Sequence, residues 1–398
     1  MKTPALLSRL GPLLVGLSLA CSPADLPSAV GGPEERDSAP VAAPTAEPEA
    51  APAPTPAPAP TPAPTPEPQA EQQPEPETAP PLPVMPEEPL AGLSACEGSI
   101  LAAFKEDERV LPGSDSEGYR VPKDAQLATM RRSFDAFFAG DLAAARRHAE
   151  AVDYTLCRGT GPESSLVFWQ PPARQGQALV ALRTGTARPV ILETPHPFFD
   201  GGTMDQGALT FRRLNLRALI SAGTHRCANR ASAGCDGTST ACGGGDYRIS
   251  DMAHTEQSMY HVAHMALSEH FEDDWVVQLH GMGDDGISVS DGTDLPTTRV
   301  SPSARVAAAL AKVFDGVTTC NPFTGFTQRD VMCGTSNTQG RHLNGSTRAC
   351  TVNSSGTSGR FIHLEQSNKV RGQVARVADA LAAALPEAPD ALATAAPE

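Results

Sequence analysis

Two histidines and two acidic residues stand at the ends of predicted strands, where their side chains could meet. His196 and Asp200 follow one predicted strand. His280 follows a second strand, and Glu365 follows a third. Two histidines and one carboxylate, with a fourth position open, form many hydrolytic zinc sites, and a further glutamate can act as general base. Zinc lowers the pKa of a bound water toward ~7. Two neutral histidines and one carboxylate leave the zinc ion enough positive charge to polarise a carbonyl.

Each of these signals also has a plain structural interpretation. Asp200 could cap a glycine turn, His280 could be a buried strand-end residue with satisfied hydrogen bonds, and Glu365 could pair with Arg371. The prolines on both sides of His196 restrict it to extended backbone. We therefore expect His196 and Asp200 to lie on a turn and not on one helix face.

The elements that must position these residues alternate between helices and strands. Apolar spacing predicts two helices within 124–153, separated at Gly140, and further helices at 211–222, 251–270, 303–314 and 366–385. Strands are predicted at 154–157, 165–169, 177–182, 189–194, 275–279 and 360–364. This order predicts an α/β domain of three layers, with a mixed sheet flanked by helices. Ligands bind beyond the carboxyl ends of strands in such sheets, which is where the four residues are expected.

At these residues the sequence resembles the zinc carboxypeptidase-like hydrolases, a superfamily that includes N-formylglutamate amidohydrolases and poly-γ-glutamate hydrolases. The resemblance covers roughly 189–385 and implies a phosphorylase/hydrolase-like fold. It implies that His196, Asp200 and His280 bind zinc (Zn2+) and that Glu365 is the base.

The chain departs from that pattern in the first pair of ligands. Carboxypeptidases space them as His-x2-Glu, whereas here the spacing is His-x3-Asp, which leaves Glu193 and Asp205 as alternatives to Asp200. Zinc N-acetylmuramoyl-L-alanine amidases look similar at 195–208 and 279–281. They would need a glutamate in the following helix, where this chain has two arginines, so the amidase is the second subtype.

The predicted helix at 251–270 carries four histidines, including His254, His261 and His264. His254 and His261 are seven residues apart, about 10.5 Å along a helix, and cannot share one ion, whereas His261 and His264 could. A polar helix face is the plainer interpretation. His254, close to the start of the helix, is our candidate for a substrate contact or proton shuttle.

Arg226 is the candidate for holding a substrate carboxylate. It follows the helix predicted after the first site segment. Arginine binds carboxylates through two parallel hydrogen bonds, and hydrolases of the resembled superfamily commonly use it in this way. The alternative is a surface arginine beside a cysteine-rich loop.

The first twenty-one residues are typical of an export signal. A basic start precedes a short apolar stretch at 10–20, which is shorter than the ~20 residues of a membrane span. The ending, Ser18 to Cys21, resembles a bacterial lipoprotein signal, in which Cys21 is lipidated and becomes the first mature residue. An ordinary cleaved signal peptide is the alternative.

Residues 22–90 are predicted to be a disordered spacer. They contain 22 of the 38 prolines and twelve acidic residues against one basic residue, Arg36. Such a segment has too little apolar surface to offset the entropy of ordering. The single folded α/β domain is therefore predicted to span 91–398, tethered away from a membrane surface.

Eight cysteines remain when Cys21 is set aside, and they predict up to four disulfides that cross-link the fold. Pairing within the 227–242 loop and within 320–350 is plausible, but the sequence does not select one connectivity. The formal net charge of −15 and the lack of a basic stripe argue against a nucleic-acid partner.

Two hypotheses follow. The first is an exported zinc hydrolase, lipid-anchored in the cell envelope of a bacterium or secreted, and monomeric. It would cleave amide or peptide bonds next to a carboxylate, in small acidic peptides, γ-glutamyl linkages or cell-wall peptides. The second is a non-catalytic surface binding module with a hydrolase-like fold.

Overall fold

The computed structural model describes residues 90, 92–106, 111–172, 174–323 and 325–389. The predicted signal at 1–21, its Cys21 and nearly all of the predicted spacer at 22–90 lie outside these residues. Leu90, the last residue of the predicted spacer, is buried against the domain. Within the described part of the chain, no helix is both long and apolar enough to cross a membrane.

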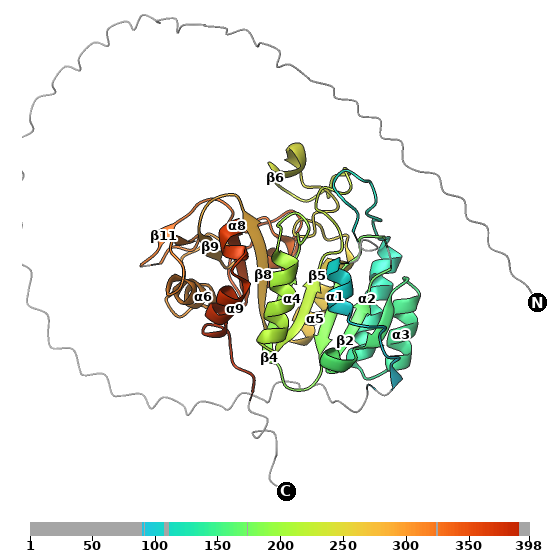
Figure 1. Ribbon diagram of the computed structural model, residues 1–398. Helices are drawn as coiled ribbons and strands as arrows, with labels where there is room; N and C mark the ends of the chain where they lie inside the picture. Colours follow the sequence, from blue (N-terminus) through green and yellow to red (C-terminus); the bar gives the residue numbers. More distant parts are fainter. Residues whose placement is uncertain (1–89, 91, 107–110, 173, 324, 390–398) are drawn as a thin grey trace, which may run out of the picture. The chain divides into compact units, whose positions relative to one another are not determined.

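A ten-stranded mixed sheet forms the centre of the domain (Figure 1). In spatial order its strands are β1 (Thr155–Arg158), β2 (Leu166–Gln170), β3 (Leu179–Arg183), β5 (Leu216–Ser221), β4 (Arg188–Thr194), β8 (Trp275–Met282), β12 (Phe361–Ser367), β9 (Ile287–Ser290), β10 (Val317–Thr319) and β11 (Thr327–Gln328). The central strands β5, β4, β8 and β12 are parallel, so their carboxyl ends meet at one edge. A separate hairpin joins β6 (Thr238–Ser239) to β7 (Gly245–Asp246).

Helices cover both faces of the sheet, as the three-layer prediction requires. One face packs against α1 (Ile100–Glu106), α4 (Thr203–Arg213), α6 (Pro302–Ala311), α8 (Asn368–Arg371) and α9 (Val374–Ala382). The other packs against α2 (Asp124–Phe138), α3 (Leu142–Glu150), α5 (Met259–His270) and α7 (Thr338–Leu343). Figure 1 shows α4 and α9 in front of the sheet and α5 behind it.

Two apolar clusters hold these layers together. Phe168 on β2 packs into the cluster under α4, while its neighbour Trp169 packs into the cluster under α2. Successive strand side chains point to opposite faces, so a strand buried on both sides is apolar along most of its length. Trp169 also donates a hydrogen bond from its indole nitrogen to Ser133, which satisfies that polar group within the core.

Three predicted helices have different boundaries in the structure. The helix predicted at 366–385 is divided into α8 and α9, and β12 extends to Ser367. The helix predicted at 211–222 is wrong: α4 ends at Arg213, a turn with Asn215 at positive φ follows, and β5 occupies 216–221. A short apolar run does not distinguish a buried strand from a helix. The helix predicted at 251–270 begins only at Met259, where the Ser258 side chain caps it, so His254 lies in the preceding loop.

Four disulfides cross-link the domain, as the even cysteine count predicts. They are Cys96–Cys157, Cys227–Cys242, Cys235–Cys350 and Cys320–Cys333. Two lie within the loops expected from the sequence, whereas Cys235–Cys350 joins the two regions. Disulfides are typical of proteins outside the cytoplasm, because thiols in the cytoplasm are kept reduced.

Candidate metal centre

The parallel strands β8 and β12 place His280 and Glu365 side by side. These two residues are paired in the strand register, and both lie near the carboxyl ends of their strands. Their neighbours Leu279 and Leu364 pack into the apolar core under α4. His280 and Glu365 therefore project from the opposite face of the sheet, toward the layer of α5.

His196 and Asp200 come from the loop between β4 and α4. The backbone N–H of Asp200 donates to the carbonyl of His196 at 2.8 Å, which closes one turn. This confirms the expected turn, and residues four apart in such a turn lie on the same side of it. Both side chains are buried, with exposed fractions of 1% for His196 and 3% for Asp200.

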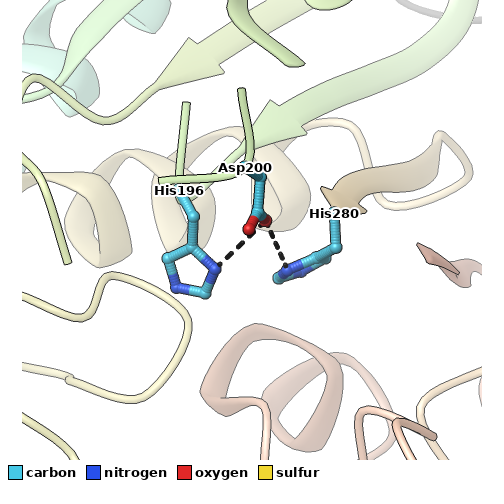
Figure 2. Close-up of side chains that lie close together, drawn as sticks. All are labelled: His196, Asp200 and His280. Carbon is cyan, nitrogen blue, oxygen red and sulfur yellow. Dashed lines mark ion pairs between the residues drawn. The ribbon is translucent and has the colours of Figure 1, made fainter. Parts of the chain in front are cut away.

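The Asp200 carboxylate lies between two imidazoles (Figure 2). Its Oδ2 atom is 3.6 Å from Nδ1 of His196 and 3.7 Å from Nδ1 of His280. Neither Oδ2 of Asp200 nor Nδ1 of His196 has a hydrogen-bond partner among the described residues. Two ligands of a tetrahedral zinc ion, each at ~2.1 Å, are separated by about 3.4 Å. The buried, unpartnered atoms and their spacing thus fit one zinc ion held by these three residues.

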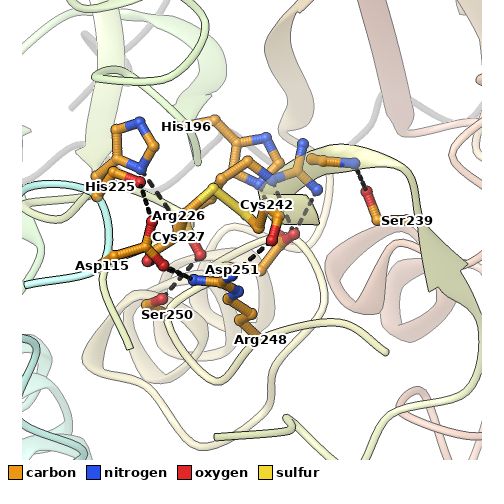
Figure 3. The surroundings of a disulfide bond; sticks show 12 residues. Asp115, His196, His225, Arg226, Cys227, Ser239, Cys242, Arg248, Ser250 and Asp251 are labelled. Atoms are coloured by element: carbon orange, nitrogen blue, oxygen red, sulfur yellow. Dashed lines mark hydrogen bonds and ion pairs between the residues drawn. A yellow bond between two sulfur atoms is a disulfide. The ribbon is translucent and has the colours of Figure 1, made fainter. Parts of the chain in front are cut away.

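The orientation of His196 is set by Asp251 (Figure 3). Nε2 of His196 is 2.7 Å from Oδ1 of Asp251, and Arg226 binds the other carboxylate oxygen. Burial raises the pKa of Asp251, but Arg226, His254 and His196 lower it well below its usual value. The ionised carboxylate can only accept, so Nε2 of His196 carries a proton, and the neutral ring has its lone pair on Nδ1. This is the carboxylate–histidine arrangement that orients metal ligands in proteins.

The pKa values of His280 and His196 are shifted in opposite directions. Burial is the main cause that lowers the pKa of His280 well below its usual value, and His363 and His196 add to it. For His196, burial and Arg226 lower the pKa, but Asp251 and Asp200 raise it overall. His280 is therefore neutral, as a metal ligand must be, whereas the carboxylates around His196 attract positive charge.

Glu365 is a buried carboxylate next to this cluster. Burial, followed by the negative charge of Asp200, raises the pKa of Glu365 to about 8. Its Oε2 atom has no hydrogen-bond partner among the described residues, and Oε1 lies 3.8 Å from Nε2 of His363. The sequence interpretation that paired Glu365 with Arg371 does not hold, because the described hydrogen bonds of Arg371 go to the carbonyls of Gly201 and Gln366.

Two further metal-competent groups overlap the first. His196, Asp251 and His254 form one, and its atoms are already joined by hydrogen bonds of 2.7 and 2.9 Å. His280, His363 and Glu365 form the other. The group with Asp200 is distinguished by two buried atoms that have no partner.

Arg226 and His254 both reach this cluster, through Asp251. The Nε and Nη2 atoms of Arg226 are bound to Asp251, and its guanidinium also lies over the Phe199 ring at 5.2 Å. Nδ1 of His254 lies 2.9 Å from Oδ1 of Asp251, and its ring stacks on Tyr247 at 3.7 Å. The side chains of Arg226 and His254 are 12% and 13% exposed, more than those of His196 or Asp200.

The two alternative acidic ligands lie elsewhere. Glu193 is fully buried and contacts His264 and Gln278, and it belongs to none of the metal-competent groups among the described residues. Asp205 on α4 lines a cavity of about 740 Å³ whose lining includes Arg183 and Arg212. None of the cluster residues lines that cavity.

Three residues of the cluster were assigned no role from the sequence. His363 lies two residues before Glu365 on β12, and the strand period of two could have indicated that both share one face. Gln278 precedes His280 by two residues in the same way. Asp251 carried no signal, because its loop reaches His196 only through the tertiary fold.

The comparisons with known proteins give distant structural similarities. No protein family model matches the sequence. No curated protein matches it significantly. Among solved structures, a bacteriophage poly-γ-glutamate hydrolase is similar at a TM-score of 0.28 and 15% identity, over 52% of this chain and 88% of that one.

Two bacterial structures are similar to a comparable degree. A candidate carboxypeptidase from Burkholderia mallei has a TM-score of 0.31 and 13% identity, over 53% of this chain and 59% of that one. A candidate metallopeptidase from Shewanella amazonensis has a TM-score of 0.26 and 13% identity, over 63% of this chain and 91% of that one. TM-scores and sequence identities this low do not support the transfer of a function. The chemistry of the cluster therefore follows from its own side chains.

Proposed function

We propose that this protein is an exported zinc-dependent hydrolase of amide or peptide bonds that lie next to a carboxylate. The observation that supports it is the convergence of His196, Asp200 and His280, each of which offers one ligand atom within 4.8 Å of the others. Three protein ligands with a fourth position open are the donor set of catalytic zinc sites, whereas structural sites use four.

Zinc held by these residues would polarise the scissile carbonyl and lower the pKa of the attacking water. The remaining steps belong to the side chains of this chain. Glu365 is the base: it removes a proton from the attacking water and returns it to the leaving amine. The charge of a bound zinc ion would lower the pKa of Glu365 from about 8 and keep it ionised for this role.

Arg226 and His254 form the part of the site that faces the substrate. Nε and Nη2 of Arg226 bind Asp251, so the two-bond carboxylate contact expected from the sequence is made within the protein. The side chain is 12% exposed, and Nη1 is the atom that would contact a substrate carboxylate or charge that develops on the carbonyl oxygen. Small acidic peptides, γ-glutamyl linkages and cell-wall peptides carry such a carboxylate. The amidase subtype has less support, because α4 ends in Arg212 and Arg213, where that subtype would need a glutamate.

The proposed location is the cell envelope. The four disulfides support a compartment outside the cytoplasm. The sequence from Ser18 to Cys21 supports a lipid anchor on a bacterial membrane. Mass spectrometry of the mature N-terminus distinguishes a lipidated Cys21 from an ordinary cleaved signal peptide.

Metal content of the purified protein is the first test. We expect one zinc per chain by inductively coupled plasma mass spectrometry, and loss of that zinc in His280→Ala. His148→Ala is the matched control, because His148 lies on α3 outside the metal-competent groups. A folded protein that takes up no zinc when it is supplied would contradict the proposal and favour the non-catalytic binding module.

A screen of amide substrates follows if zinc is present. We expect release of amino groups from peptides that carry a free carboxylate next to the scissile bond. The same peptides with that carboxylate amidated should be cleaved at least tenfold more slowly. Equal rates on both series would contradict the role given to Arg226.

A further inference from the structure

A second buried hydrogen-bond network lies behind His280. Nε2 of His280 is 2.7 Å from Oε1 of Gln278, which precedes it by two residues on the same face of β8. Both side chains are buried, with exposed fractions of 4% and 0%. The tautomer of His280 therefore depends on which end of the Gln278 amide faces it, since an oxygen requires Nε2–H and an NH2 group requires a lone pair.

Asn337 determines the orientation of that amide. The Oδ1 atom of Asn337 accepts a hydrogen bond from the backbone N–H of Gly340 at 3.0 Å, where Asn337 caps α7. A backbone N–H can only donate, so the opposite end of the Asn337 amide is its NH2 group. That group donates to the same Gln278 atom that faces His280, and this atom is therefore oxygen.

Glu193 imposes the same orientation from the other side. The Gln278 NH2 group donates to Oε2 of Glu193 at 2.9 Å, and Oε1 of Glu193 is 2.7 Å from Nδ1 of His264. Turning the Gln278 amide would bring its oxygen against the Glu193 carboxylate and its NH2 group against that of Asn337. Two independent contacts thus exclude the reversed amide.

We propose that Gln278 is a positioning residue that holds His280 in the Nε2–H tautomer, with Glu193 and Asn337 fixing the Gln278 amide. Nδ1 of His280 then keeps its lone pair directed toward Asp200, 3.7 Å away. The inference rests on the proposed zinc site for its function. It also assigns Glu193, an alternative ligand in the sequence, to a supporting contact two hydrogen bonds behind His280.

The tautomer is tested first, in the metal-free protein. Long-range 1H–15N correlation spectra separate Nε2–H from Nδ1–H histidines, and the His280→Ala variant assigns the resonance. We expect the Nε2–H pattern for His280 in the wild type and a mixture of tautomers in Gln278→Leu. An Nδ1–H pattern in the wild type, or an unchanged pattern in folded Gln278→Leu, would overturn the inference whether or not zinc binds.

Zinc affinity is measured next, by competition with a chromophoric chelator. Loss of a contact that orients a metal ligand costs 10–100-fold in metal affinity, which is the loss expected for Gln278→Leu. Gln206→Leu is the matched control, because Gln206 is a fully buried amide that pairs with Gln366 on the other face of the sheet. An equal loss in the control would mean that any buried amide matters, and the assignment to Gln278 would fail.

A swap of two side chains separates positioning from packing. Gln278→Glu alone sets two carboxylates against each other across the 2.9 Å contact, and we expect weaker zinc binding. Adding Glu193→Gln restores one carboxylate and one amide across that contact, and the hydrogen bond of 3.4 Å from Gln278 to Oε1 of Gln339 is the one contact among the described residues that the double variant does not restore. We expect the double variant to recover zinc affinity to within about threefold of the wild type. A folded double variant as weak as the single one would reject the proposal.

Failure of the proposed function would look different from failure of this inference. A wild type without zinc affinity, but with His280 as Nε2–H, would remove the metal site and leave the orienting role of Gln278 intact. A wild type that binds zinc with an affinity unaffected by Gln278→Leu would leave the metal site intact and remove the positioning role of Gln278.

Discussion

Oδ1 of Asp251 lies 2.7 Å from Nε2 of His196, although the two residues are fifty-five positions apart in the chain. Both side chains are almost completely buried, and the second oxygen of Asp251 is bound by Arg226. One carboxylate thus orients a candidate metal ligand and is itself neutralised by an arginine. Several properties of the site depend on this contact.

Replacing Asp251 by asparagine should weaken zinc binding by 10–100-fold. The amide can present either its oxygen or its NH2 group to His196, so the histidine loses its single tautomer. Chelator competition measures the change, and Asp246→Asn on the exposed β7 strand is the control. Wild-type affinity in Asp251→Asn would show that the contact does not position His196.

Removing the positive charge of Arg226 should destabilise the fold itself. Arg226→Met leaves the Asp251 carboxylate buried without its main cation, and breaking a buried pair in this way costs about 3–5 kcal/mol. Urea denaturation measures the loss. Arg230→Met, whose pairs with Asp115 and Glu117 are exposed, should change stability by under about 1 kcal/mol. Equal effects of the two variants would contradict the buried ion pair.

Substituting Glu365 by glutamine should separate catalysis from metal binding. The amide cannot accept the proton of the attacking water, and we expect kcat to fall by about 10²–10⁴-fold. Zinc content and melting temperature should remain at wild-type values, because Glu365 is not one of the three proposed ligands. Loss of zinc would identify it as a ligand, and retained activity would exclude it as the base.

The Cys227–Cys242 disulfide should stabilise the loop that carries Arg226 (Figure 3). A closed loop of about fifteen residues contributes roughly 3 kcal/mol on the chain-entropy model. We expect Cys227→Ser with Cys242→Ser to lower the unfolding free energy by about 2–3 kcal/mol. The double substitution is needed because a single one leaves a reactive thiol. An unchanged free energy of unfolding would show that the backbone contacts alone hold this loop.

Stability should decline in mild acid in part because of His342, which is not one of the candidate metal ligands. Burial and then the charge of His264 lower the pKa of His342 to about 4, below the ~6.5 of an unfolded histidine. The folded state binds fewer protons than the unfolded state between these values. The contribution is fully present above about pH 6.5 and is lost as the pH falls toward 4. His342→Gln should flatten the dependence of unfolding free energy on pH in that window, and a curve parallel to the wild type would contradict it.

The sequence alone was sufficient for the layer architecture and for locating three strand-end segments that carry candidate ligands. Strand–helix alternation and apolar runs predict a sheet buried on both faces, because strands in such sheets are near-continuous apolar runs. A histidine or acidic residue at the end of such a strand stands out against that apolar background. His280 and Glu365 were identifiable for this reason, and the structure places them in register on adjacent strands.

Only the tertiary structure decided which acidic residue faces both histidines and what orients them. Glu193, Asp200 and Asp205 are equivalent by residue type and proximity, but only Asp200 lies between the two imidazoles. Asp251 and Asn337 reach the site from loops whose positions depend on long-range packing and disulfides. Burial on a strand leaves a local apolar pattern in the sequence. Hydrogen-bond partners that are distant in the sequence leave no such pattern, so the sequence could predict the strands but not the partners that orient the site residues.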